Sequence, residues 1–109
     1  MSFSIKYLNE ASQKLGRLND EIEENIANGN WDMAYKTTIE FTEKWKDYST
    51  KIKIFFNHQE IDNIEIELQK LPQYIKEKTK DEALASSHVL NFLLKHIAEL
   101  EKIKVQNVF

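Results

Sequence analysis

Cysteine is absent from this sequence, and glycine and proline are scarce: Gly16, Gly29 and Pro72 are the only ones among 109 residues. The absence of cysteine excludes disulfides, thiolate metal sites and cysteine nucleophiles. Sandwiches and barrels need many turns, and α/β folds need glycine-rich loops, so both classes are disfavoured. The sequence therefore predicts an all-α protein with a few long helices.

Long apolar runs and a strong net charge are also missing. No run approaches the roughly 20 apolar residues of a membrane span, and the first residues lack the hydrophobic segment of a signal peptide. We therefore expect the chain as it stands to be soluble. Its net charge is −3, with both signs mixed. Because nucleic-acid binders usually carry a strongly basic face, we expect no nucleic-acid partner.

The length fits a single domain, 1–109. Apolar residues make up 41% of the chain and charged residues 30%, a composition typical of globular proteins. Two helices are predicted in the first half, from Phe3 to Ala27 and from Trp31 to about Phe56. Between them, Gly29 suits a left-handed helix end and Asn30 an N-cap. Gly16 lies off the apolar face, where we expect either close approach of a neighbour or simple tolerance. The predicted core positions are Leu8, Ala11, Leu15, Leu18 and Ile22 in the first helix, and Trp31, Ala34, Thr38, Phe41, Trp45, Tyr48, Ile52 and Phe55 in the second.

The sign of the charge reverses between the second and third helices. Lys51 and Lys53 lie near the end of the second, whereas Glu60 and Asp62 open the third. Cations favour helix C-termini and anions favour N-termini. The reversal predicts a tight turn across Asn57-His58-Gln59.

The second half predicts two more helices. Pro72 lies inside the third, where we expect a kink or a break into two pieces. Thr79 and Glu82 form a predicted capping box that opens the fourth helix. This helix should run to about Lys102 and be followed by a tail, 103–109. The predicted core positions are Ile61, Ile64, Leu68, Leu71 and Ile75 in the third helix, and Ala83, Leu90, Leu94 and Ile97 in the fourth, with Leu93 and Leu100 alongside.

Four helices joined by short turns predict an antiparallel up-down bundle, kinked at Pro72. In that topology the end of the fourth helix approaches the start of the third. One polar cluster is therefore predicted, comprising His58, Glu60, Asp62, His96, Glu99 and Glu101. Such side chains can hold zinc or another divalent ion. They can also complement helix ends, with the histidines near free carbonyls. We favour this second interpretation and predict no metal or other cofactor.

Signals of catalysis are weak elsewhere in the chain. His88 is isolated in the sequence and should be exposed. The adjacent pair Ser86-Ser87 has no positioned acid–base partner and no glycines of a nucleophile elbow. A phosphate-binding loop is also absent from the sequence. We therefore predict that the protein is not an enzyme.

Several segments together resemble a bacterial family, domain-of-unknown-function family four-three-six-three. They are Asn30-Trp31 with Ala34, then Trp45, the run Phe55-Phe56-Asn57-His58-Gln59-Glu60-Ile61-Asp62, Leu93-Leu94-Lys95-His96-Ile97 with Glu99 and Glu101, and Val105-Gln106-Asn107-Val108. The resemblance implies a small helical protein, often tethered by an N-terminal membrane helix and facing outward from a Gram-positive-type cell. It implies no known activity. An upstream anchor would make the domain extracytoplasmic; without one, we expect it in the cytoplasm.

The functional prediction is a non-enzymatic interaction or scaffold module with a protein partner. The alternative is a bundle that binds a metal or small ligand at its His58/His96 end. The apolar residues Ile39, Val89 and Phe92 lie off the predicted core faces. They could bury in a homodimer or inside a thick bundle.

Overall fold

The computed structural model describes residues 3–56 and 58–108. They form four helices: α1 (Phe3–Ala27), α2 (Trp31–Phe55), α3 (His58–Lys76) and α4 (Lys80–Val108). Within these two ranges no strand occurs. The predicted all-α fold with four helices is confirmed, and the bounds predicted for α1 match at both ends.

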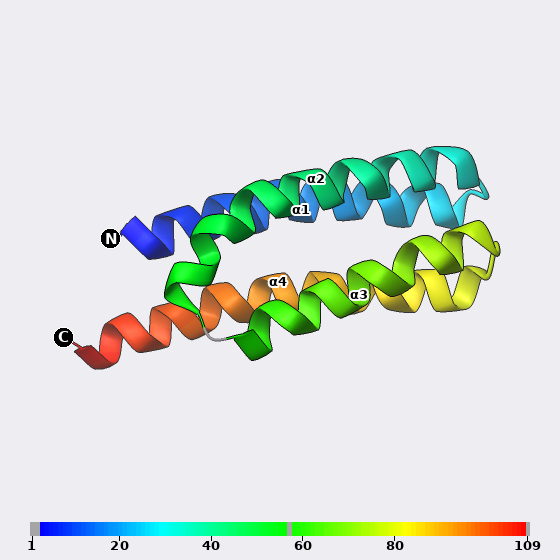
Figure 1. Cartoon of the computed structure of the whole chain (residues 1–109). Coiled ribbons are helices and arrows are strands. Elements are labelled where there is room, and N and C mark those ends of the chain that lie inside the picture. Colours follow the sequence, from blue (N-terminus) through cyan, green and yellow to red (C-terminus); the bar gives the residue numbers. More distant parts are fainter. Residues whose placement is uncertain (1–2, 57, 109) are drawn as a thin grey trace.

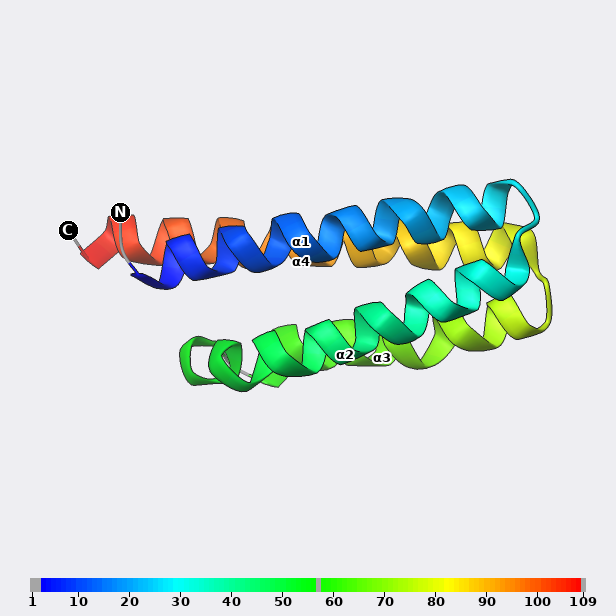
Figure 2. The same cartoon turned by 90° about the horizontal axis from the view of Figure 1, so that it is seen from above.

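The four helices form a long bundle that measures 48 × 21 × 20 Å. Each helix packs against two others: α1 and α3 both contact α2 and α4. Figure 1 shows the start of α1 and the end of α4 at one end of the bundle and the α1–α2 and α3–α4 turns at the other. In Figure 2 the last turns of α4 extend past the start of α3, in keeping with their lengths of 29 and 19 residues.

The core is built from one face of each helix. All five predicted positions of α3 are buried, and so are Ala34, Phe41, Trp45 and Ile52 of α2. The face of α1 differs from the prediction at two positions. Asn19 is buried where Leu18 was expected, with Leu18 half-buried, and Ile26 is buried in addition. The side chain of Phe55 lies outside the described residues.

The two turns at one end of the bundle have the same backbone geometry. After α1, the Asn30 amide bonds the Asn25 carbonyl at 2.8 Å and the Gly29 amide bonds the Ile26 carbonyl at 3.1 Å. After α3, the amides of Thr79 and Lys78 make the equivalent bonds. Both are Schellman turns, which need a left-handed residue. Gly29 supplies it in the first turn with φ 75°, as predicted, and Lys78 supplies it in the second with φ 56°.

Several predicted helix ends are wrong. His58 and Gln59 are the first residues of α3, not a turn; Asn57 lies outside the described residues. The tail predicted from Ile103 is helical, since α4 continues to Val108. α3 is one helix through Pro72, so the break predicted there is absent. The kink predicted at Pro72 stays a prediction.

The predicted caps are correct in position but not in their hydrogen bonds. Asn30 precedes α2 without a side-chain cap bond. Thr79 precedes α4, and its hydroxyl donates to the Tyr74 carbonyl at 3.1 Å. Among the described residues it makes no reciprocal pair with Glu82. The helix starts therefore rely on the backbone bonds Asn30–Ala34 and Thr79–Ala83, both 2.9 Å long.

Candidate functional site

Of the six residues in the predicted polar cluster, two come together. His96 on α4 and Glu60 on α3 face each other across the α3–α4 seam, with 3.9 Å between His96 Nε2 and Glu60 Oε2. Both side chains are partly exposed, at 41% and 21%. An ion pair at this distance forms only when the imidazole is protonated, and solvent weakens it.

The other members point elsewhere. His58 and Asp62 are exposed on α3. Glu99 is exposed on α4 and pairs along the same helix with Lys102 at 3.6 Å. Within residues 3–56 and 58–108, no group of three or more His, Asp and Glu side chains is placed to hold a metal ion. His96 and Glu60 alone cannot supply the four ligands typical of zinc.

Glu101 occupies a core position of α4 and is 3% exposed. Its Oε1 is buried without a hydrogen bond among the described residues. The ammonium of Lys104, one turn further along α4, lies 3.8 Å from Oε1. Glu101 is thus a member of the bundle interior, not of an open cluster with His58 and Asp62.

The sequence interpretation missed a buried polar contact between α1 and α4. Asn19 Nδ2 donates to the Ser87 carbonyl at 2.7 Å, and Ser87 Oγ donates to Asn19 Oδ1 at 3.0 Å. The neighbouring Ser86 donates to Glu67 Oε2 on α3 at 2.8 Å. Both serines are buried, so their hydroxyls hold helices together and do not face a substrate. In the sequence, Asn19 falls at a core position of the apolar spacing in α1, and this position was the sign that its side chain is buried.

His88 is exposed, as predicted, and it has a partner in space that its isolation in the sequence did not indicate. Its Nε2 lies 3.0 Å from Glu23 Oε1 on α1, with the His88 side chain 68% exposed. This contact bridges α1 and α4 at the surface. It serves as a second link beside the buried Asn19–Ser87 pair, and an exposed pair of this kind contributes at most about 1 kcal/mol.

Several apolar side chains lie on the outward side of α4. Phe92 is 64% exposed, Ile103 53% and Val89 40%. At 3.6 residues per turn, these three side chains fall within about 60° of one another around the helix. The Phe92 ring stacks on the His96 ring, with 5.6 Å between their centroids and 11° between their planes. This outer α4 strip, Val89, Phe92, His96 and Ile103, is distinct from the core face.

The profile of one protein family, Domain of unknown function (DUF4363), matches residues 2–108. The chain belongs to this family. The resemblance drawn from the His58 run and the segments around Trp31 and His96 is thereby confirmed. Neither the curated proteins nor the solved structures contain a match to this DUF4363 chain. In the described part of the chain, no helix is both long and apolar enough to cross a membrane.

Proposed function

We propose that this DUF4363 domain is a non-enzymatic interaction module whose partner packs on the outer α4 strip. The observation that supports the proposal is the exposure of Phe92, Ile103 and Val89 on one side of a helix whose other side is already buried. A helix in a lone bundle needs one apolar face. A second apolar face on the same helix is typical of a helix that packs against a further element.

The spacing of the strip favours a helical partner. Val89, Phe92 and His96 are separated by three and four residues, and Ile103 follows seven residues after His96. This is the repeat by which two helices meet along a seam. The stacked pair Phe92–His96 forms a broad, flat centre, and buried aromatic side chains supply much of the energy of protein interfaces.

The family resemblance supports a location for this module relative to the cell membrane. It implies a domain held outside the cell by a membrane helix upstream of the bundle. We propose that arrangement for the parent protein, with α4 presented to a partner at the cell surface. The full reading frame upstream of Met1 tests it: an apolar segment of about 20 residues is expected there. An open reading frame that encodes no such segment would contradict the anchor and leave the interaction proposal standing.

Site-directed photo-crosslinking tests the interaction. A photoreactive phenylalanine analogue is placed at Phe92, and separately at Gln69, an exposed residue of α3 away from the strip. In bacterial cells that make the natural protein, the residue-92 probe should yield a discrete protein adduct, either a second copy or another chain. The Gln69 probe should yield none.

A Phe92→Glu substitution tests whether the apolar ring at position 92 is needed for the partner to bind. Because Phe92 is 64% exposed, the variant should keep the melting temperature within a few degrees. Because position 92 is then occupied by glutamate, the photoreactive residue is placed at Val89 instead, and the Phe92→Glu variant should form no adduct from there. Equal adducts from residues 92 and 69, or an adduct that survives Phe92→Glu, would contradict the proposed surface.

A further inference from the structure

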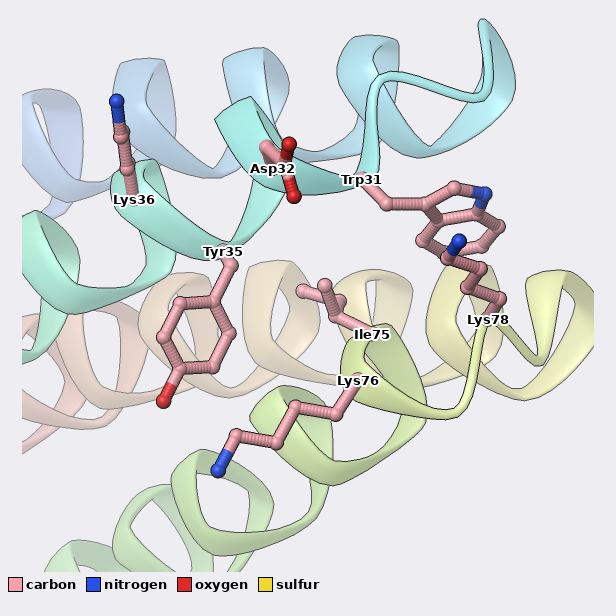
Figure 3. A pocket seen from close by; sticks show the side chains of 7 residues that line it. All are labelled: Trp31, Asp32, Tyr35, Lys36, Ile75, Lys76 and Lys78. Carbon is pink, nitrogen blue, oxygen red and sulfur yellow. The ribbon is translucent and has the colours of Figure 1, made fainter.

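A recess lies at the other end of the bundle, between the start of α2 and the end of α3 (Figure 3). Its volume is about 440 Å³, within the range of about 300–1,000 Å³ found for small-molecule sites. Trp31 and Tyr35 of α2 form two walls and are half-buried, while the buried Ile75 of α3 lies between them. The recess therefore offers two aromatic rings and an aliphatic floor to a ligand.

Three lysines line the same recess: Lys36, Lys76 and Lys78. Figure 3 shows the Lys78 side chain at the Trp31 end and that of Lys76 at the Tyr35 end. The Lys76 ammonium is 5.5 Å from the centre of the Tyr35 ring. Asp32 is the only acidic residue in the lining, and none of the three lysines forms an ion pair with a carboxylate of the described residues. The recess thus carries a local excess of positive charge on a chain of net charge −3.

The backbone at Lys78 is a second, independent observation. Lys78 has φ 56°, a conformation that costs a non-glycine residue about 1–3 kcal/mol. The equivalent position after α1 is Gly29, which adopts the same turn without that cost. A lysine held in this conformation places an ammonium at the edge of the recess, and strained residues gather at binding sites.

From these observations we propose that the Trp31–Lys78 recess binds a small aromatic carboxylate. The rings of Trp31 and Tyr35 contact the aromatic body, and the ammonium groups of Lys76 and Lys78 contact the carboxylate as point charges. This site is separate from the outer α4 strip, so either proposal can fail without the other. The carboxylate is held near the surface, where the pairs with lysine are partly screened by water.

Titration with naphthalene-2-carboxylate, followed by nitrogen–proton NMR, tests the proposal. The chain has two tryptophans, so the indole N–H signals of Trp31 and Trp45 can be followed separately. Trp45 is buried and its indole donates to Glu65 at 3.3 Å, which makes it an internal reference. The Trp31 signal should shift saturably, and the Trp45 signal should stay. Naphthalene-2-carboxamide, the neutral analogue, and inorganic phosphate should each bind at least about tenfold more weakly.

Lysine variants show which ammonium groups contribute to binding of the carboxylate. Replacing Lys76 or Lys78 with glutamine should weaken binding about two- to fivefold each. The Lys36 side chain points away from the recess (Figure 3), so Lys36→Gln should have a smaller effect. The matched control is Lys51→Gln, because Lys51 also lies over a tyrosine ring, 5.4 Å from the centre of Tyr7. Lys51 is near the far end of α2, about 20–30 Å along the helix from the residues that line the recess. This control should bind the carboxylate as the natural chain does.

Lys78→Gly separates binding from folding. Relief of the left-handed lysine should raise the melting temperature by about 4 °C or more, while the affinity for the carboxylate falls. A weaker but more stable variant cannot be explained by misfolding. The proposal is overturned if the Trp31 signal does not saturate, if the amide or phosphate binds as tightly as the carboxylate, or if the recess variants lose no more affinity than Lys51→Gln.

Discussion

Asn19 on α1 and Ser87 on α4 are joined by two hydrogen bonds in the bundle interior, at 2.7 and 3.0 Å. Both residues are at most 1% exposed. Apolar contacts between helices tolerate a shift by one turn, whereas these two bonds form at one alignment only. Removing the Asn19 amide breaks both bonds and leaves the Ser87 hydroxyl without its partner, whereas removing the Ser87 hydroxyl leaves Asn19 Oδ1 without its partner but keeps the bond to the Ser87 carbonyl. The pair therefore fixes how α1 and α4 align along the bundle.

A double-mutant cycle measures this contact. Asn19→Ala should lower the free energy of unfolding by about 2–3 kcal/mol, and Ser87→Ala by about 1–2 kcal/mol. The double variant should lose less than the sum, with a coupling of about 1 kcal/mol. Thr38→Val is the control, because Thr38 is also buried but bonds its own helix at the Ala34 carbonyl. Urea unfolding gives all four values; additive losses would show that the two bonds are not coupled.

Tyr7 gives the fold a sensitivity to alkali. Burial raises the pKa of Tyr7 above its usual value of 10.0, with repulsion from Tyr48, Glu10 and Asp47 adding to the effect. A raised pKa means that the folded state favours the neutral phenol. The resulting stability is complete below about pH 10 and is lost as the pH rises through the folded-state pKa. Urea midpoints measured from pH 8 to 11 should therefore fall more steeply above pH 10 for the natural chain than for Tyr7→Phe. Parallel profiles would exclude this role of Tyr7.

Helix positions were predictable from the sequence because local signals agree there. The α1 end at Ala27 and the α2 start at Trp31 follow from the single glycine of the Asn28–Asn30 segment. The α3 core face has a regular apolar spacing, and all five positions are buried. By contrast, no capping residue marks the end of α4 in the sequence. The last residues were therefore predicted to be a tail, although the helix continues to Val108. Asn19 was missed because a polar residue in a core position is recognised only once its partner, Ser87, is known.

The polar cluster was less predictable, because topology places residues at one end of a bundle without giving the direction of their side chains. Neighbouring positions on one helix point in different directions: Glu60 faces α4, whereas His58 and Asp62 are exposed. On α4, Glu99 points outward and Glu101 inward. Two residues along a helix amount to a rotation of about 200°. The His58 run thus lies within the family match, residues 2–108, and the side chain that it turns toward His96 is that of Glu60.

Zinc should not stabilise the protein. Because His96 and Glu60 supply two ligands at most, excess Zn²⁺ should change the melting temperature by less than about 1 °C. Isothermal calorimetry should show no saturable heat, and His96→Ala should respond to zinc as the natural chain does. A saturable heat that disappears in both His58→Ala and His96→Ala would establish the metal-binding alternative at this end of the bundle.

The two glycines should respond in opposite directions to the same substitution. A methyl group at Gly16 would meet no atom within 4 Å outside its own stretch of helix, so the structure favours tolerance over close approach at this position. Gly16→Ala should therefore raise the free energy of unfolding by about 0.5–1 kcal/mol, because alanine loses less conformational freedom in a helix.

Gly29 also has open space around it, but its φ of 75° disfavours a side chain, and Gly29→Ala should lower the free energy of unfolding by about 1–2 kcal/mol. Since each variant adds one methyl group, the pair isolates the backbone effect. Thermal unfolding of both, compared with the natural chain, gives the result; a loss of stability in Gly16→Ala would show that a neighbour needs the space.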